Sequence, residues 1–502
     1  MVCTTIRNIL TSAEKRFGNE DAIRYKIKKD EIGAKSYTQL KNDSEGFSRA
    51  IESLGEKGNH IAIIGMTSYE WIVSYLGTVN SGSVAVPLDV SLPASELCEL
   101  INRADVTALV FDEIRKDVAT LAKEKCPKLQ HIISMQKAES DTSALSLWEI
   151  ILKNQGSYDF VPDENSLCTI MFTSGTTGIS KGVMLTHKNL AENATCLDMK
   201  IEPRTVILSV LPIHHAYCLC MDILKGISLG CIICINDSLL RVAKNIKLFK
   251  PNMVLMVPLM IETMAKKLED TKGIPAWLVK KQVFGKQFHT IVSGGAYLNP
   301  AYIDLFEKYG ITILQGYGMT ECSPVISTNL PWKIKSNSVG KLMPNCKAKV
   351  VDEELWVSGG SVMQGYYKMP KETEDALKDG WLVTGDLGYI DDEGYVFLTG
   401  RKKNLIITKN GENVSPEEIE NTLSENRLVQ EVLVREKEGV IEAEIFPDYE
   451  YIKKKKISDI QTEMQKLIDE FNKTVPPYKK VYSLIIRETE FEKTQTKKIK
   501  RF

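Results

Sequence analysis

The sequence has little of several features that would place it in a special class. Its 502 residues carry 64 Lys and Arg against 65 Asp and Glu, so the net charge is −1. This balance argues against a nucleic-acid partner and against a strongly acidic tail. A hydrophobic fraction of 43% with 26% charged residues excludes collagen-like, disordered and membrane-embedded compositions. We therefore expect an ordinary globular chain, without internal repeats or low-complexity linkers.

Cysteine is neither even in number nor densely spaced. The eleven cysteines are scattered from Cys3 to Cys346, whereas a disulfide framework shows an even, dense set in a short chain. We interpret them as reduced thiols, which predicts a cytoplasmic location. The tightest group lies in apolar sequence without the polar turns that present zinc ligands, so a metal site there is disfavoured. Its members are Cys218, Cys220, Cys231 and Cys234.

Long uninterrupted apolar runs are also missing. Residues 1–10 include Arg7 and have no apolar core of a secretory signal. The longest apolar stretch, 206–235, contains residues that are costly at the centre of a bilayer. These are Pro212, His214, His215, Asp222 and Lys225. No transmembrane segment is expected.

Helix and strand patterns alternate over the first 400 residues. Helices are expected at 44–54 and 69–79. Buried strands are expected at 61–64, 84–86, 108–111, 131–134, 206–210, 232–235, 253–257, 291–293 and 311–314. This repeated β-α-β pattern predicts an α/β fold of layered, mostly parallel sheets with helices on both faces. A strand-rich subdomain is expected from 342 to 398.

Near Gly400 the sequence changes character. A short basic joint, Arg401 to Asn404, precedes about a hundred residues that predict a small α+β domain. Strands are expected there at 432–435 and 441–446, and a helix at 457–474. The lysines at 453–456 are expected at the start of that helix, on a solvated face. The predicted domains are therefore 1–400 and 401–502.

The most informative segment is 169–187, TIMFTSGTTGISKGVMLTH. A strand-like lead runs into a loop whose glycines let the backbone approach a polyanion, while hydroxyls and a lysine supply donors and charge. This pattern predicts a phosphate-cradling loop. Its residues are Thr173, Ser174, Gly175, Thr176, Thr177, Gly178 and Lys181. The spacing does not fit a Walker loop.

This segment closely resembles the signature of the adenylate-forming superfamily, roughly YTSGTTGxPKGV, although Ser180 stands where proline is usual. The superfamily includes acyl-CoA synthetases, luciferases and peptide-synthetase adenylation domains. Other signatures follow in the family's order over nearly the whole chain, and this collinearity identifies the chain as a member. The resemblance implies that the loop holds ATP and that Thr176 is catalytic.

Residues 315–321, QGYGMTE, resemble the family's next signature. The resemblance implies nucleotide contacts from Gln315, Gly316 and Tyr317. An aromatic ring flanked by glycines suits adenine, a threonine hydroxyl suits the α-phosphate, and a carboxylate suits Mg²⁺. Thr320 and Glu321 are thereby implied as catalytic, with Glu321 as the metal ligand.

Residues 293–296, SGGA, match the turn whose backbone lies against the nucleotide and borders the acyl pocket in the family. This implies that Gly295 and Ala296 contact the nucleotide and that Gly294 lines the pocket. Residues 211–217, LPIHHAY, resemble the acid-binding segment of acyl- and aryl-CoA synthetases, with His215 at the pocket position. Because no carboxylate stands there to pair a substrate ammonium, amino acids are disfavoured.

The remaining signatures are similar to the family's ribose, hinge and tail segments. In 380–386, GWLVTGD, the resemblance implies that Asp386 binds the ribose hydroxyls, with Arg401 nearby and Lys403 as the pivot. The hinge sequence resembles long-chain acyl-CoA synthetases, and Gly411 is implied in the loop that admits the thiol arm. In the tail, 494–501, Lys498 aligns with the catalytic lysine, although Lys497 stands where glycine is usual.

The resemblance implies a two-step ligase that uses ATP and Mg²⁺ to convert a carboxylic acid into acyl-AMP and then transfers the acyl group to CoA. A medium- to long-chain fatty acid is the favoured substrate. An aryl acid, an acyl carrier protein as acceptor, and a non-catalytic acyl- or nucleotide-binding relative stay open as alternatives. Peripheral contact with a membrane also stays open.

Overall fold

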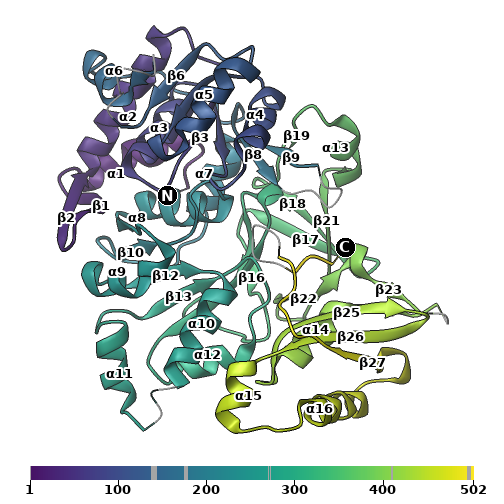
Figure 1. Cartoon of the computed structure of the whole chain (residues 1–502). Helices are drawn as coiled ribbons and strands as arrows, with labels where there is room; N and C mark the ends of the chain where they lie inside the picture. The colour runs from purple at the N-terminus through teal and green to yellow at the C-terminus, as the bar shows by residue number, and fades with distance from the viewer. Residues whose placement is uncertain are drawn as a thin grey trace.

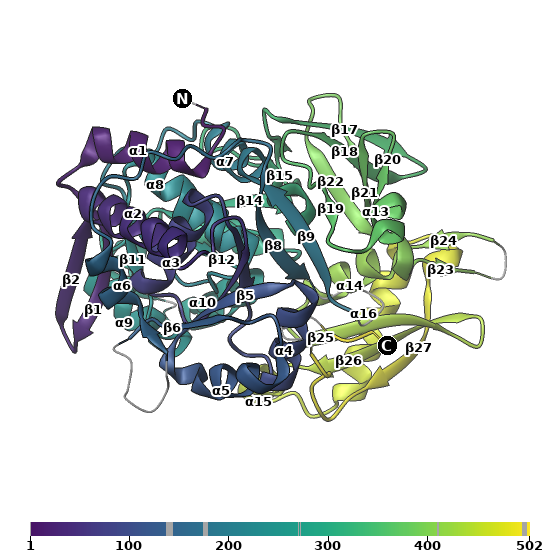
Figure 2. The same cartoon turned by 90° about the horizontal axis from the view of Figure 1, so that it is seen from above.

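The fold was examined in a computed structural model that describes residues 2–136, 144–173, 179–269, 271, 273–408, 411–493 and 499–501. Two large sheets and a smaller antiparallel one make up most of the chain before residue 402, and the last hundred residues form a separate small α+β unit (Figures 1 and 2). The predicted α/β class is confirmed. In the described part of the chain no helix is both long enough and apolar enough to cross a membrane.

The first sheet has the strand order β19-β9-β8-β4-β3-β5-β6-β7. Its strands are β3 (His60–Ile64), β4 (Val84–Leu88), β5 (Val106–Phe111), β6 (His131–Ser134), β7 (Leu145–Ser146), β8 (Leu167–Thr173), β9 (Lys181–Thr186) and β19 (Gly365–Tyr366). All pairs from β7 to β8 are parallel, whereas β9 and β19 are antiparallel additions at one edge.

The second sheet has the order β16-β15-β14-β13-β12-β10-β11-β1-β2. Its strands are β1 (Asp21–Lys28), β2 (Glu31–Ser36), β10 (Val206–Ser209), β11 (Ile232–Ile235), β12 (Met253–Met256), β13 (Thr290–Ser293), β14 (Thr312–Gly318), β15 (Val325–Thr328) and β16 (Lys341–Leu342). The predicted strands of this region are all present, but the β1–β2 hairpin was not predicted. Its burial is irregular because it lies at the sheet edge, so its sequence lacks a buried-strand pattern.

Helices cover both large sheets. They are α1 (Ile6–Phe17), α2 (Tyr37–Ser53), α3 (Tyr69–Asn80), α4 (Ala94–Arg103), α5 (Lys116–Lys125), α6 (Leu147–Lys153), α7 (His187–Thr195), η2 (Cys218–Leu224), α8 (Lys225–Leu229), α9 (Val242–Phe249), α10 (Pro258–Glu269), α11 (Ala276–Val283) and α12 (Pro300–Glu307). The helix expected at 44–54 begins earlier, because Ser36 forms a capping box with Gln39. Most residues of η2 and α8 are buried, and these elements belong to the main core.

The strand-rich subdomain is a third, antiparallel sheet made of β17 (Cys346–Val351), β18 (Glu354–Gly359), β20 (Leu377–Lys378), β21 (Trp381–Ile390) and β22 (Val396–Arg401), with α13 (Pro370–Ala376) beside it. Arg401 is the last residue of β22 and pairs with Asp386. The division into domains 1–400 and 401–502 stays a prediction. In the structure the third sheet ends with Arg401, and the elements of the C-terminal unit follow it.

The C-terminal unit has its own apolar core, which includes Ile419, Ala443, Ile445 and Met464. Its elements are β23 (Ile406–Ile407), β24 (Asn413–Val414), α14 (Pro416–Ser424), β25 (Val429–Lys437), β26 (Val440–Pro447), α15 (Tyr449–Lys455), α16 (Ile460–Thr474) and β27 (Val481–Ile486).

One expectation about the lysine run at 453–456 is wrong. These lysines do not start the helix predicted at 457–474, which begins at Ile460. They form the last turn and C-cap of the separate helix α15. Positive charge there stabilises the helix, because the C-terminal end of the helix dipole is negative. Their exposure to solvent agrees with the predicted solvated face.

Candidate active site

Two of the predicted nucleotide-binding segments lie side by side at the carboxyl edge of the second sheet. Strands β13 and β14 are parallel, and Ser293 pairs with Gln315. The turn Gly294–Ala296 therefore leaves the sheet beside Gly316 and Tyr317. The carboxyl edge of a parallel sheet is where α/β proteins bind their ligands.

A chain of short bonds joins this edge to the third sheet. The Tyr317 hydroxyl donates to Asp386 Oδ2 at 2.6 Å, and Arg401 Nε lies 2.6 Å from Asp386 Oδ1. Tyr317 and Asp386 are 8% and 5% exposed as residues, so the two oxygens of the carboxylate are largely shielded from water. Burial and then the neighbouring carboxylate raise the pKa of Tyr317, which keeps it a hydrogen-bond donor. Three residues predicted from separate motifs thus form one connected group.

Glu354 supports this group and was not predicted. Its buried carboxylate accepts from the Gly385 backbone N–H at 2.9 Å and pairs with Lys402 Nζ at 2.9 Å. It thereby holds both neighbours of the Asp386–Arg401 pair. No sequence motif marked it, because its role depends on the pairing of β18 with β21.

A second connection runs from the predicted metal ligand to the phosphate-loop lysine through Tyr366. The Tyr366 hydroxyl donates to Glu321 Oε1 at 2.9 Å, and Lys181 Nζ lies 4.8 Å from the centre of the Tyr366 ring. Burial, and then Glu321, raise the pKa of Tyr366. Glu321 sits in the short helix η4 (Thr320–Cys322), which follows β14 directly. Tyr366 was missed, since only the pairing of β19 with β9 brings it here.

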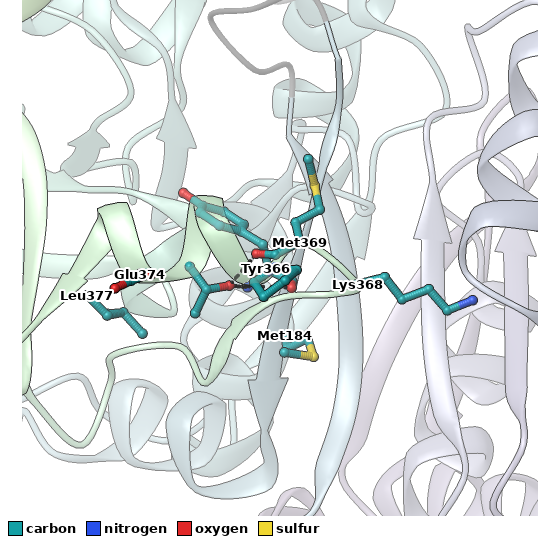
Figure 3. A pocket seen from close by; sticks show the side chains of 8 residues that line it. Met184, Tyr366, Lys368, Met369, Glu374 and Leu377 are labelled. Atoms are coloured by element: carbon teal, nitrogen blue, oxygen red, sulfur yellow. Dashed lines mark hydrogen bonds between the residues drawn. The ribbon is translucent and has the colours of Figure 1, made fainter.

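A hollow of about 430 Å³ opens beside Tyr366 (Figure 3). Its lining is mostly apolar, with Met184, Met369 and Leu377 around the tyrosine. Lys368 extends away from the other side chains in Figure 3 and pairs with Asp105. No predicted site residue lines this hollow, but Tyr366 borders it and also contacts Glu321 and Lys181.

The predicted phosphate-binding loop is described only at its two ends. Thr173 and Lys181 pair across the β8–β9 hairpin, and Thr173 Oγ1 donates to the Lys181 carbonyl at 3.5 Å. The hairpin therefore brings the two predicted residues together at its open end. The other predicted residues of the loop, together with the tail lysine, lie outside the described residues. They are Ser174, Gly175, Thr176, Thr177, Gly178 and Lys498.

Asn193 of α7 fixes the segment that carries Thr320 and Glu321. Its side-chain amide donates to the Val325 carbonyl and to Ser361 Oγ, both at 2.8 Å, and its carbonyl oxygen accepts from the Val325 N–H at 3.2 Å. These bonds are fully buried. Because α7 follows β9, Asn193 links the phosphate hairpin to the segment after β14, and it too was missed by motif reasoning.

The predicted acid pocket has mainly apolar walls. A side chain at Gly294 would lie 3.2 Å from the ring of Tyr217, and one at Gly295 would lie 3.9 Å from Val257. Gly295 also has φ +88°, a conformation that favours glycine. Tyr217 donates to the Val292 carbonyl at 3.3 Å, which fixes its ring over this turn. His215, the predicted pocket residue, is exposed, and its ring centre lies 4.3 Å from that of His214.

The two histidines beside this pocket are held largely neutral, whereas the pKa of Asp89, 3.6 Å from His214 Nε2, is lowered because its partial burial is outweighed by His214 and by the hydrogen bonds from Ser91. Burial, and then the neighbouring His215, lower the pKa of His214 to about 3. Desolvation also lowers the pKa of His215. Asp222 lies close to Tyr217 but is fully buried, and burial raises its pKa to about 7. Asp222 accepts from Ser209 at 2.9 Å and is closed to a ligand. Asp222 therefore does not offer an accessible carboxylate next to Gly294.

The predicted pivot lies among charges from several segments. Partial burial, then Arg401, and also Arg501 lower the pKa of Lys403. Arg501 pairs with Glu420 and lies 3.4 Å from Glu417. The described end of the tail motif is therefore close to the Asp386–Arg401 pair, across the joint between the two parts of the chain.

Gly411 is not near the other predicted residues. It is exposed and lies between β23 and β24, which are far from β13 in Figure 1 and from β14 in Figure 2. Its φ of +82° favours glycine, and a side chain there would meet nothing within 4 Å. The structure thus separates the predicted thiol loop from the predicted nucleotide contacts.

The donor set around Glu321 fits a magnesium ion bound with a nucleotide. Among the described residues no group of three or more His, Cys, Asp or Glu could hold a metal by itself. Mg²⁺ is usually bound by one or two carboxylates together with substrate phosphates. Glu321 supplies one such carboxylate, and Tyr366 leaves its second oxygen for the metal.

Comparisons with known proteins agree with this arrangement. The AMP-binding enzyme family model matches residues 10–367, and the model of the AMP-binding enzyme C-terminal domain matches residues 403–502. The chain is 28% identical over 481 residues to the long-chain-fatty-acid–CoA ligase of Bacillus subtilis, covering 86% of this chain and 82% of that protein. It is 28% identical over 443 residues to the 4-coumarate–CoA ligase-like 9 of Oryza sativa, covering 80% and 76%.

Solved structures show the same fold. The anthranilate CoA ligase AuaEII bound to anthranoyl-AMP matches with a TM-score of 0.85 at 21% identity, covering 99% of this chain and 95% of that one. The fatty acyl CoA synthetase of Mycobacterium tuberculosis matches with a TM-score of 0.73 at 22% identity, covering 99% and 97%.

The chain belongs to the AMP-binding enzyme family. The predicted resemblance to adenylate-forming enzymes of the acyl-CoA synthetase type is confirmed, and so is the AMP-forming ligase class of enzyme.

Proposed function

We propose that this enzyme activates a medium- to long-chain fatty acid as acyl-AMP and transfers the acyl group to CoA. One observation carries the proposal for the site. Tyr317, Asp386 and Arg401 form a bonded group beside the Gly294–Gly295 turn, so nucleotide and acid contacts would meet at one sheet edge.

In the first half-reaction, the substrate carboxylate attacks the α-phosphorus of ATP. A carboxylate oxygen–phosphorus bond forms, and the bond to the pyrophosphate oxygen breaks. Catalysis of this kind rests on positioning and on stabilising charge at the phosphoryl oxygens. We assign this stabilisation to Thr176, Lys181, Thr320 and Lys498. Mg²⁺ bound at Glu321 would neutralise phosphate charge, with Tyr366 orienting the carboxylate.

In the second half-reaction, a thiol attacks the acyl carbonyl and AMP leaves. We assign Lys403 as the pivot and Gly411 as part of the loop beside the thiol arm. The distance of Gly411 from the nucleotide contacts supports a rotation between the two steps, since one arrangement cannot present both loops. The position of Arg501 near Lys403 and Arg401 supports the present arrangement as the one for adenylation.

The apolar walls around Gly294 and Gly295 support a hydrocarbon acid. A substrate ammonium beside Tyr217 and Val257 could not reach the fully buried Asp222, and burying it unpaired there would be costly. The closeness of Tyr217 to Gly294 also suits a flat aryl acid, which is the second candidate. CoA is the proposed acceptor, and a carrier-protein thiol is the alternative. The cytoplasmic location stays a prediction.

The test is acid-dependent release of pyrophosphate across fatty acids of increasing chain length and a set of aryl acids. We expect the highest kcat/KM with a fatty acid, and a maximum with an aryl acid would transfer the assignment to the second candidate. CoA and a phosphopantetheine carrier protein are then compared as acceptors. Lys498→Ala should abolish pyrophosphate release, whereas Gly411→Leu should slow only thioester formation.

A further inference from the structure

Arg103, the last residue of helix α4, contacts both sides of the hairpin that carries the predicted phosphate-binding loop. Its Nη2 donates to the Ser180 carbonyl at 2.6 Å, and its guanidinium carbon lies 5.6 Å from the centre of the Phe172 ring. Phe172 belongs to β8 and Ser180 directly precedes β9, beside α4 in Figure 1. One side chain therefore spans the open end of the hairpin, next to Thr173 and Lys181.

The Ser180 carbonyl is a stronger partner for Arg103 than its neighbouring carboxylate. Glu99 Oε1 lies 3.8 Å away and the Glu99 side chain is 67% exposed, so this ion pair is weak. The bond to the carbonyl is short, charge-assisted and partly buried. A cation in the last turn of α4 also favours the helix dipole, but that role does not explain a bond to a residue 77 positions away.

The bonded carbonyl belongs to the position where this chain departs from the family signature. Ser180 stands where proline is usual. Proline fixes φ of its own residue and restricts the backbone of the residue before it, which here is Ile179. Serine imposes neither restriction. A guanidinium that holds the carbonyl of the same residue can supply the missing restraint from outside the hairpin.

This restraint acts directly on Lys181. The Ser180 carbonyl and the Lys181 N–H belong to one planar peptide unit, so a bond to the carbonyl fixes the orientation of both. Lys181 Nζ lies 4.8 Å from the centre of the Tyr366 ring, and Tyr366 donates to Glu321 at 2.9 Å. The peptide unit held by Arg103 is therefore the one from which the predicted phosphate lysine reaches the predicted metal ligand's surroundings.

The corner between α4 and β5 also holds the hairpin from its other side. The Tyr367 hydroxyl donates to Asp105 Oδ2 at 2.6 Å. The Tyr367 backbone N–H in turn donates to the Gly182 carbonyl at 2.8 Å. The same corner thus fixes the residue before Lys181 directly and the residue after it through Tyr367.

We propose that Arg103 is a positioning residue for ATP, which holds the Ser180 carbonyl so that Lys181 meets the phosphates in a fixed orientation. The contact of Lys181 with the phosphates rests on the proposed function. The effect of Arg103 on nucleotide affinity is measured without any acid substrate.

The experiment is calorimetric titration of ATP and of AMP into the full chain and into Arg103→Gln, with the melting temperature of each protein as a check on folding. We expect ATP affinity to fall about tenfold, since one charge-assisted bond is lost. AMP affinity should stay within about twofold, because AMP lacks the β- and γ-phosphates. Damage to the fold as a whole would weaken both nucleotides alike, so the ratio of the two affinities is the readout.

Arg16→Gln is a matched control. Arg16 Nη1 donates to the Ser228 carbonyl at 3.2 Å, and its guanidinium carbon lies 4.5 Å from the centre of the Phe17 ring. These are the same two kinds of contact as those of Arg103, but they join α1 to α8, apart from β8 and β9 in Figures 1 and 2. The control should bind ATP and AMP as the wild type does.

The substitution Ser180→Pro tests the restraint itself. In the wild-type background it should leave ATP affinity unchanged, because Arg103 already holds this residue. In the Arg103→Gln background it should restore ATP affinity to within about threefold of the wild type, since proline restricts the same backbone. Proline brings no charge, so this rescue separates a backbone restraint from the loss of a positive charge near ATP.

Several results would overturn the proposal. They are unchanged ATP affinity in Arg103→Gln, equal losses for ATP and AMP, and an equal loss in Arg16→Gln. A Ser180→Pro protein that binds ATP normally but gives no rescue would overturn it as well. If the expected ATP and AMP affinities were found but no acid gave pyrophosphate release, the proposed function would be contradicted and the positioning role of Arg103 upheld.

Discussion

The bonded group Tyr317–Asp386–Arg401 gives the sharpest test of the nucleotide site. The test compares Tyr317→Phe, which keeps the ring and removes the hydroxyl, with Tyr317→Ala, which removes both. The hydroxyl donates to Asp386 at 2.6 Å, while Arg401 holds the other carboxylate oxygen at 2.6 Å. The two substitutions therefore separate orientation of the carboxylate from stacking of the ring.

The expected losses follow from these contacts. A buried hydrogen bond to a charged group is worth about 1.5–3 kcal/mol, but Arg401 still orients Asp386 in Tyr317→Phe. We therefore expect ATP affinity to fall by no more than about tenfold. Loss of an aromatic–base stack costs about 1–3 kcal/mol more, so Tyr317→Ala should bind ATP a further ~5- to 150-fold more weakly.

The assay is calorimetric titration of ATP and of AMP into each variant. Tyr389→Ala is the matched control, because Tyr389 lies on the same strand as Asp386, is 50% exposed, and stacks on Phe397 outside the site. If Tyr317→Ala bound ATP within about twofold of the wild type, the ring would not contact the nucleotide. Equal losses in both variants would refute stacking and leave only orientation of Asp386.

The remaining predictions concern the metal ligand, pH and the joint. Tyr366→Phe leaves Glu321 without its donor, so half-maximal pyrophosphate release should require several-fold more Mg²⁺, and an unchanged Mg²⁺ titration would argue against Glu321 as ligand. Burial lowers the pKa of His187 to about 4. As the pH falls below about 6.5, this histidine therefore becomes protonated in the unfolded chain but stays neutral in the folded one. Stability should be full above pH 6.5 and fall by up to about 3 kcal/mol as pH drops toward 4, and His187→Phe should flatten this slope in urea unfolding followed by fluorescence. Lys266 of α10 pairs with Asp448 at the start of α15 at 2.8 Å, across the joint. Lys266→Gln should slow pyrophosphate release more than thioester formation. If the substitution changed the rates of both half-reactions by the same factor, the pair would not favour this arrangement.

Local patterns predicted most of the buried strands. The apolar runs at 61–64, 232–235 and 253–257 became β3, β11 and β12 because parallel strands covered on both faces must be apolar throughout. The β1–β2 hairpin escaped prediction since an edge strand carries no such constraint. The lysines at 453–456 were misplaced because a charged run does not indicate whether it begins one helix or ends another.

The sequence by itself determined the chemistry. The order of its glycine-, threonine- and acid-containing motifs identified the family, and the residues after β13, β14 and β8 were predicted as ligand contacts from local sequence alone. Such motifs are readable because backbone approach to phosphate and base requires particular residues at fixed local spacing.

Only the tertiary structure decided how these motifs are held. Tyr366, Glu354 and Asn193 reach Glu321, Gly385 and Val325 from strands and helices far away in sequence. A hydrogen bond or a surface between distant segments leaves no local period in the sequence, because it is fixed by strand order and packing.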